Sequence, residues 1–356
     1  MAEYTNAERV FRAMETKQPD RVPHFETAVD HNVANVILPG ASYEEFAEYM
    51  DWDALVHYDR PYGSGYLREE VLSESPRITR DEWGAVKRYT DEMTPIPLEA
   101  PVKSEKDLGN FKPPDPDDER RYQLLKRWVE QYKGKRAIIA VVTDHNSITS
   151  DVLGFEDRLM AFYTNPELVL RVHQIVLDYE LRYINNVIEV GADVVFINGD
   201  WAYKNGPMFS MEHFNRFVYP PFKAMVAEAK KGGVYVMKHS DGNINPLLNS
   251  IVGAGINALH PIDPSAEMDI GEIKKNYGDR ICLIGNVDCA HTLTFGSTEE
   301  VKQATKEVIR RAGTGGGLIT SSSNSIHKAV PPENYLEMVK TIRDYGKYPL
   351  DMAALN

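Results

Sequence analysis

The most concentrated set of chemically active side chains is the run His239-Ser240-Asp241-Gly242-Asn243, which follows a short apolar segment. A histidine and a carboxylate two residues apart at the end of a strand could both reach one ligand. Such a pair could hold a divalent metal or exchange a proton with a substrate. A plainer interpretation also fits, in which Asp241 caps the next helix and His239 packs beneath it.

Polar residues follow seven other apolar segments in the same way. Turn formation explains Asp, Asn, Ser and Gly at such places, but it does not explain the repeated histidines. We therefore predict that these segment ends meet at one functional site. They read Glu26-Thr27, Tyr58-Asp59, Asp144-His145-Asn146, Asn198-Gly199-Asp200-Trp201, His260-Pro261-Ile262-Asp263, Asn286-Val287-Asp288 and residues 321–327, which end in His327.

Candidate roles follow from these residue types. We predict that acid–base or metal chemistry involves His239, Asp241, Asp200 and His145, with His239 and Asp241 also as metal ligands. Tyr58, Trp201 and Tyr203 could line a pocket for an aromatic ring, although Trp201 could equally be a packing residue. The remaining predicted substrate-binding residues are Glu26, His260 and Asn324. Cys289 is more typical of a small buried hydrophobic residue than of a ligand.

Eight short apolar runs must position these side chains. Most are continuous rather than alternating, which is typical of parallel strands covered on both faces. Helical patterns separate them, so the sequence predicts an α/β (β/α)₈ TIM barrel with its active site at the carboxyl ends of the strands. The runs are residues 22–25, 54–58, 137–143, 192–197, 234–238, 256–259, 281–284 and 318–320.

The sequence also predicts the bounds of three helices and one insertion between two of the strands. Helices are expected over 167–190, 211–231 and 298–311, after good capping residues and before glycines. Residues 77–89 alternate apolar and polar side chains around a central turn, which predicts a β-hairpin after the second strand. We interpret residues 64–116 as a region inserted in a single domain of residues 1–356, where it could form a wall or lid of the site.

Composition limits the function classes. The chain has 356 residues, 42% of them apolar, and a net charge of −13 from 53 acidic and 40 basic residues. An acidic surface disfavours nucleic acid and anionic membranes as partners. Two cysteines cannot make a disulfide framework, and the N-terminus shows no secretory signal, so a cytoplasmic location is expected.

The order of these motifs resembles the uroporphyrinogen decarboxylase superfamily over nearly the whole chain. That resemblance implies a (β/α)₈ barrel, in agreement with the strand count. The motifs that carry it are Glu8-Arg9-Val10, the run from Pro19 to Pro23, Asp200, Gly206-Pro207 with Ser210, His239-Ser240-Asp241-Gly242, Gly285-Asn286-Val287-Asp288 and Pro332-Glu333-Asn334.

The superfamily has two main branches. Decarboxylases bind a tetrapyrrole through an arginine-rich segment after the first strand, whereas residues 25–31 here contain no arginine. In the corrinoid-dependent methyltransferase branch, zinc-using members carry His-x-Cys-Gly after strand five and a further Cys after strand eight. His239 matches that histidine, but Asp241 and Asn324 stand at the cysteine positions. The resemblance thus implies a harder site of His239 and Asp241 with Glu26, His145 or Asp200, or a metal-free acid–base site.

The activity implied by this resemblance is methyl transfer from a small donor to Co(I) of a corrinoid on a partner protein. A methoxylated aromatic is one candidate donor, which would make the reaction an O-demethylation, and Zn²⁺ or another divalent metal is a candidate cofactor. Two alternatives remain: a decarboxylase or lyase acting on a different acid, and a non-catalytic barrel that docks a corrinoid protein. The polar residues at all eight segment ends weigh against pure docking.

Overall fold

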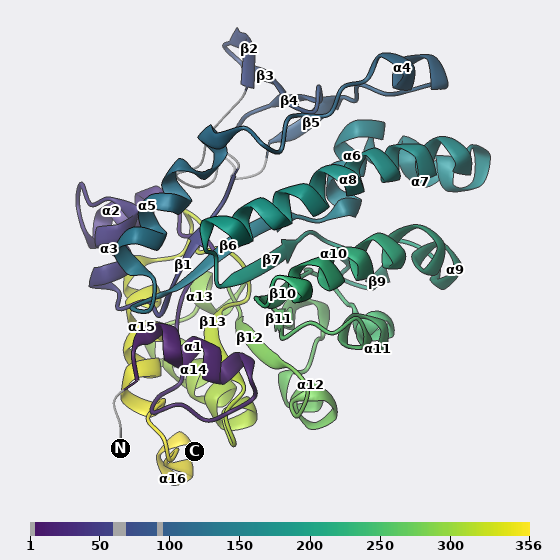
Figure 1. Cartoon of the computed structure of the whole chain (residues 1–356). Helices are drawn as coiled ribbons and strands as arrows, with labels where there is room; N and C mark the ends of the chain where they lie inside the picture. Colours follow the sequence, from purple (N-terminus) through teal and green to yellow (C-terminus); the bar gives the residue numbers. More distant parts are fainter. Residues whose placement is uncertain (1–3, 60–68, 91–94) are drawn as a thin grey trace.

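One curved sheet of seven parallel strands forms the centre of the computed structural model, which describes residues 4–59, 69–90 and 95–356 (Figure 1). The strands pair in chain order. Seven predicted strands are confirmed, with bounds shifted by at most a few residues. They are β1 (Ala54–His57), β6 (Ala137–Thr143), β7 (Val194–Asn198), β10 (Tyr235–His239), β11 (Ala258–His260), β12 (Cys282–Val287) and β13 (Leu318–Ser322).

The predicted first strand, residues 22–25, is not a regular strand. Its backbone nevertheless bonds to both edges of the sheet. The Thr320 N–H donates to the Pro23 carbonyl at 3.0 Å, and the Asp53 N–H donates to the His24 carbonyl at 2.8 Å. His24 also forms an isolated parallel bridge with Thr320. Because proline has no N–H, Pro23 interrupts the hydrogen bonding that a longer strand would need.

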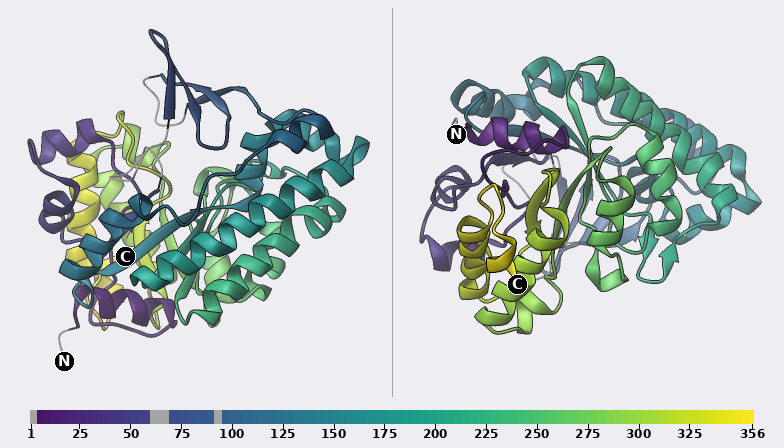
Figure 2. Two further views of the ribbon diagram at one scale, coloured as in Figure 1. Left: turned by 45° about the horizontal axis from the view of Figure 1, so that its top comes forward. Right: turned by 90° about the horizontal axis from the view of Figure 1, so that it is seen from below.

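Helices cover the outer face of the sheet (Figures 1 and 2). Among the described residues, no helix combines the length and apolar character that crossing a bilayer would demand. The helices are α1 (Asn6–Met14), α2 (His31–Ile37), α3 (Tyr43–Tyr49), α4 (Glu105–Asn110), α5 (Gln123–Tyr132), α6 (His145–Leu153), α7 (Phe155–Thr164), α8 (Pro166–Val190), α9 (Met211–His213), α10 (Tyr219–Lys231), α11 (Leu248–Gly253), α12 (Ile270–Tyr277), α13 (Thr292–Phe295), α14 (Thr298–Ala312), α15 (Pro332–Tyr345) and α16 (Met352–Leu355).

The capping residues mark the predicted helices well. The Asn165 side chain accepts from the Leu168 N–H at the start of α8, and Gly191 ends that helix in the left-handed conformation, with φ 115°. The Ser297 side chain likewise opens α14 with a capping box. The helix expected over 211–231 is divided, because a π-helical turn over Phe214–Val218 separates α9 from α10.

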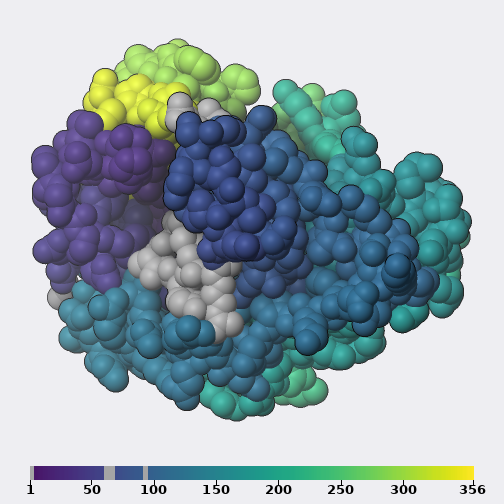
Figure 3. Space-filling model, turned by 90° about the horizontal axis from the view of Figure 1, so that it is seen from above, coloured from purple at the N-terminus to yellow at the C-terminus, as the bar shows by residue number. Residues whose placement is uncertain are grey.

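The inserted region forms a second, antiparallel sheet in the order β2-β3-β4-β5. The predicted hairpin is its central pair, and residues 64–68 of the insertion lie outside the described residues. In the view from above, this blue segment lies between the purple N-terminal helices and the teal helices (Figure 3). Lys87 fastens it to α6 through an ion pair with Asp151 at 2.8 Å. The strands are β2 (Glu69–Glu74), β3 (Arg77–Asp81), β4 (Val86–Arg88) and β5 (Ile96–Glu99).

Candidate active site

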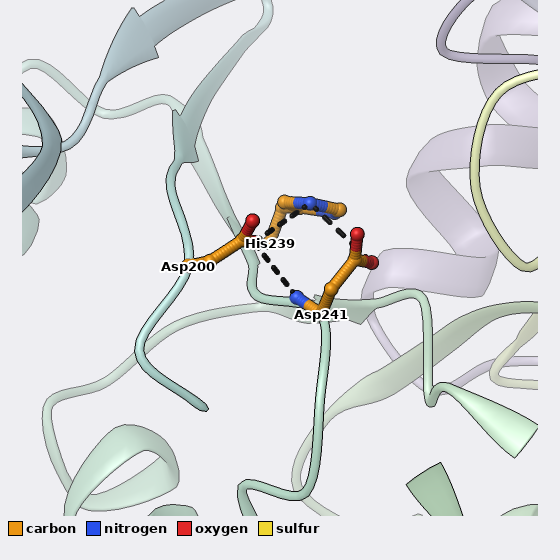
Figure 4. Close-up of side chains that lie close together, drawn as sticks. All are labelled: Asp200, His239 and Asp241. Atoms are coloured by element: carbon orange, nitrogen blue, oxygen red, sulfur yellow. Dashed lines mark hydrogen bonds and ion pairs between the residues drawn. The ribbon is translucent and has the colours of Figure 1, made fainter. Parts of the chain in front are cut away.

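Three of the predicted residues converge at the carboxyl ends of β7 and β10 (Figure 4). The Nε2 atom of His239 lies 3.3 Å from Asp200 Oδ1 and 3.6 Å from Asp241 Oδ1. The backbone N–H of Asp241 donates to Asp200 Oδ1 at 2.9 Å, which fixes the two loops against each other. One ligand atom from each residue lies within 4.8 Å of the other two, so the group could hold a metal ion.

Electrostatics in this triad favour a charged histidine. Burial works against the imidazolium, but the carboxylates of Asp241 and Asp200 outweigh it and raise the pKa of His239. Burial also raises the pKa of Asp241, with repulsion from Asp200 adding to it. The pKa of Asp200 is lowered instead, because its contact with His239 outweighs the effect of burial. The pKa values of the two carboxyl groups therefore differ, as an acid–base site requires.

His260 and Asn324 each contact one residue of this triad. The Nδ1 atoms of His239 and His260 lie 2.7 Å apart, and His260 is buried. The side-chain amide of Asn324 donates to Asp241 Oδ2. Both residues were predicted to bind substrate, but the structure places His260 behind His239, whereas Asn324 reaches the cavity described below.

A cavity of about 640 Å³ opens above the triad. Its walls include Asp200, His239 and Asp241 together with the predicted residues Tyr58 and Asn324. The insertion supplies the opposite wall, as predicted, through Glu69, Asp81, Glu82, Trp83, Lys87, Tyr89, Pro95 and Pro97. Trp83 and Tyr89 were predicted as part of the hairpin but not as site residues, although aromatic residues within a strand-exit insertion were a usable signal.

Four predicted residues neither line the cavity nor bond to a side chain of the triad. His145 is buried with Nδ1 3.2 Å from Glu180 Oε2 on α8, and burial lowers its pKa to about 3. Trp201 is a packing residue whose Nε1 donates to Asp144. Tyr203 is 53% exposed on the short strand β8 (Ala202–Tyr203). Glu26 is buried against Ser322. The expectation that His145 shares one cavity with His239 is therefore wrong, because its helix turns the ring toward α8.

A buried ion pair beneath the triad escaped sequence reasoning. Lys238 Nζ lies 3.1 Å from Asp144 Oδ2 and donates to the Gly199 carbonyl at 2.7 Å, with side-chain exposures of 0% for Lys238 and 2% for Asp144. The same ammonium lies 3.9 Å from the centroid of the Trp201 ring. Lys238 thus ties the loop that carries Asp200 to the start of α6. A lysine within an apolar strand was the available signal.

Comparison with known proteins agrees with this architecture. Residues 84–345 match the family "Uroporphyrinogen decarboxylase (URO-D)". The chain is 25% identical over 277 residues to a uroporphyrinogen decarboxylase of Alkalilimnicola ehrlichii, covering 74% of this chain and 72% of that protein. It is 24% identical over 351 residues to the methylcobamide:CoM methyltransferase MtbA of Methanosarcina mazei, covering 97% of this chain and 99% of that protein.

A solved structure is also similar along the whole chain. The methyltransferase from Methanosarcina mazei superposes with a TM-score of 0.75 at 19% identity, covering 96% of this chain and 99% of the other. The protein is therefore a member of the uroporphyrinogen decarboxylase family, which confirms the superfamily resemblance seen in the sequence motifs. The similarity to methyltransferases extends over nearly the full length of the chain, in keeping with the methyltransferase branch of that resemblance.

Proposed function

We propose that this protein is a corrinoid-dependent methyltransferase that takes a methyl group from a small donor to the cobalt of a corrinoid held by a partner protein. The observation that carries the proposal is the triad of Asp200, His239 and Asp241 at the floor of the cavity. Similarity to the methylcobamide:CoM methyltransferase MtbA over 97% of the chain supports a methyl transfer that involves a corrinoid.

The triad suits activation of a leaving oxygen. The reduced corrinoid supplies a nucleophile for the methyl carbon, and the electron pair of the broken carbon–oxygen bond then stays on the donor oxygen. That oxygen must be neutralised within the site. In the metal-free form, His239 donates the proton from Nε2, since two carboxylates hold the imidazole charged and orient it.

A divalent metal fits the same three groups. One imidazole nitrogen and two carboxylate oxygens form a harder donor set than the histidine and thiolates of zinc-using relatives. Cys289 does not replace a thiolate ligand, because burial raises the pKa of its thiol to about 12. His239, Asp200 and Asp241 would hold the ion, which would supply a Lewis acid for the departing oxygen.

The cavity has the size and lining for a small aromatic donor. Its volume of about 640 Å³ lies within the range typical of small-molecule sites. Tyr58, Trp83, Tyr89 and Phe196 contribute aromatic surface to its walls. We therefore keep a methoxylated aromatic as the proposed donor. The closed eight-stranded barrel is proposed as its frame, supported by the backbone bonds from residues 23 and 24 to both edges of the sheet.

A carboxy-lyase is the second candidate, because the family match carries the decarboxylase name. Among the described residues that line the cavity, the basic side chains are Lys87 and His239, and Lys87 is already paired with Asp81 and Asp151. A tetrapyrrole with many carboxylates would meet mainly acidic walls there. The charge of the cavity therefore favours methyl transfer over decarboxylation of such a substrate.

One experiment separates these candidates. The purified protein is incubated with cob(I)alamin, free or loaded on a corrinoid-binding protein, and with methoxylated aromatics, and the cobalt spectrum is followed. We expect conversion of Co(I) to methyl-Co(III), which His239→Ala abolishes while leaving the circular dichroism spectrum unchanged. Decarboxylation of uroporphyrinogen by the same preparation, without any cobalt methylation, would overturn the proposal.

A further inference from the structure

A buried carboxyl group, Glu26, lies behind the cavity and has no part in the chemistry described above. Its residue is 1% exposed. Among the described residues, Ser322 alone donates to it, through the backbone N–H to Oε1 at 3.0 Å and through the hydroxyl to Oε2 at 2.6 Å. Ser322 ends strand β13, so this contact joins the residue that follows the first predicted strand segment to the last strand of the sheet.

The hydroxyl of Ser322 faces two oxygen atoms at once. One is Glu26 Oε2 and the other is the backbone carbonyl of Asn324. A hydroxyl carries a single proton, so it can donate to only one of these two acceptors. A proton on Glu26 resolves the conflict, because the acid then donates to Ser322 Oγ and Ser322 donates to the Asn324 carbonyl. Burial acts in the same direction and raises the pKa of Glu26 to about 8.

The chain of contacts continues into the triad. Asn324 donates its side-chain amide to Asp241 Oδ2 and accepts the Ser325 N–H at Oδ1, at 2.6 Å. These two bonds fix the orientation of the amide, with nitrogen toward Asp241. Asn324 and Ser325 also line the cavity. The order Glu26, Ser322, Asn324, Asp241 therefore links a buried acid to a residue of the proposed site.

We propose that Glu26 is a positioning residue that, as a neutral acid, holds Ser322 and Asn324 so that Asn324 orients Asp241. When Glu26 loses its proton, the Ser322 hydroxyl turns to the carboxylate and the Asn324 carbonyl loses its donor. The loop at 322–325 then loosens, and Asp241 is no longer oriented by the amide. The consequence for catalysis rests on the proposed function, but the proton on Glu26 and the order of the loop do not.

Other titratable groups near Glu26 stay neutral over the relevant pH range. Tyr335 on α15 and Cys289 after β12 both interact with the Glu26 charge. Burial raises the pKa of Tyr335 well above its ordinary value and that of Cys289 to about 12. Glu26 is thus the group of this cluster that changes charge between pH 7 and pH 9.

The test compares the wild type with Glu26→Gln, whose amide can donate to Ser322 Oγ at every pH while its carbonyl accepts the Ser322 N–H. Glu130→Gln, at an exposed position on α5, is the matched control. Infrared spectra at pH 7 should show a protonated carboxylic acid that Glu26→Gln alone removes. Absence of that band in the wild type would overturn the proposal.

Hydrogen exchange then reports the loop without any turnover. At pH 9, after correction for intrinsic exchange, the Ser325 amide should exchange faster in the wild type than in Glu26→Gln, since about nine in ten Glu26 groups are then charged. Ser322→Ala should exchange fast at both pH values. Equal wild-type and Glu26→Gln rates at pH 9 would overturn the proposal. If methyl transfer is found, its rate at pH 9 should be about tenfold lower than at pH 7 in the wild type and not in Glu26→Gln, because about one in ten Glu26 groups is then still neutral.

Discussion

The imidazoles of His239 and His260 face each other through their Nδ1 atoms, 2.7 Å apart, at the ends of the neighbouring strands β10 and β11. One nitrogen must donate and the other must accept. His239 also turns Nε2 toward two carboxylates, and burial keeps the pKa of His260 well below its ordinary value. His239 is therefore the donor, and neutral His260 is the acceptor that orients its ring through the Nδ1 proton.

Replacing that acceptor tests the relationship. We expect His260→Leu to lower the pKa of His239 and to weaken divalent metal binding by roughly 10–100-fold, as the loss of a group that orients a ligand does. The measurements are NMR titration of the His239 ring and competition with a metal chelator. His291→Leu is the control, because His291 is 66% exposed and pairs only locally with Asp288. Unaltered metal affinity in His260→Leu would contradict the role.

The metal preference should follow the donor atoms of the triad. With Asp200, His239 and Asp241 as ligands, the wild type should accept harder ions such as Mn²⁺ as well as Zn²⁺. Asp241→Cys combined with Asn324→Cys places thiolates where zinc-using relatives have them, next to His239. We expect this double variant to bind Zn²⁺ more tightly and Mn²⁺ more weakly, and its Co²⁺ form to gain thiolate charge-transfer absorption. An unchanged Zn²⁺ to Mn²⁺ preference would count against ligation by Asp241.

Stability should fall as pH rises through the titration of Glu26. Its pKa is raised from 4.5 to about 8 in the fold, so the native state binds the proton more tightly than the unfolded chain. The resulting stabilisation is present at low pH and is lost between about pH 4.5 and pH 8, on the order of 5 kcal/mol. Urea unfolding across this range should show the decline, and Glu26→Gln should flatten it. A wild-type profile identical to that of Glu26→Gln would refute the raised pKa.

Much of the fold was predictable because parallel strands buried on both faces leave long apolar runs. Residues 137–143 form β6 with the predicted bounds, and Asn165 and Gly191 marked both ends of α8. Residues 22–25 do not form a regular strand, because Pro23 has no backbone N–H to donate. The apolar character of the segment alone does not reveal this missing donor. The π-helical turn within 211–231 left no signal in the apolar periodicity.

The triad was predictable for the same geometric reason, since strand ends meet at one edge of a parallel sheet. His239, Asp241 and Asp200 do meet there. His145 does not, because the first turn of α6 rotates its ring toward Glu180, and no spacing rule gives that rotation. Tertiary contacts decided the role of Trp201 in the same way, by pairing its indole N–H with buried Asp144. Sequence identifies which residues arrive at a strand end, but packing decides which way each one points.

The buried pair of Lys238 and Asp144 gives the sharpest prediction about the support of the site. Asp144→Asn leaves a desolvated ammonium without its carboxylate, which should destabilise the fold by roughly 3–5 kcal/mol. Lys238→Met combined with Asp144→Asn should recover part of that loss, because no buried charge is then unpaired. Urea unfolding measures both, and Lys231→Met at an exposed pair with Glu228 should change stability by less than about 1 kcal/mol.

The same variants distinguish stabilisation of the fold by Lys238 from positioning of Asp200. Lys238 Nζ bonds the Gly199 carbonyl, so Lys238→Met should release the neighbouring Asp200 from its place beside His239. Metal affinity should then fall even in a Lys238→Met/Asp144→Asn protein that is folded at low temperature. If that double variant binds metal as tightly as the wild type, Lys238 stabilises the fold without positioning Asp200. If the double variant is less stable than Asp144→Asn alone, the pair is not a charge pair of the kind inferred from its 3.1 Å contact.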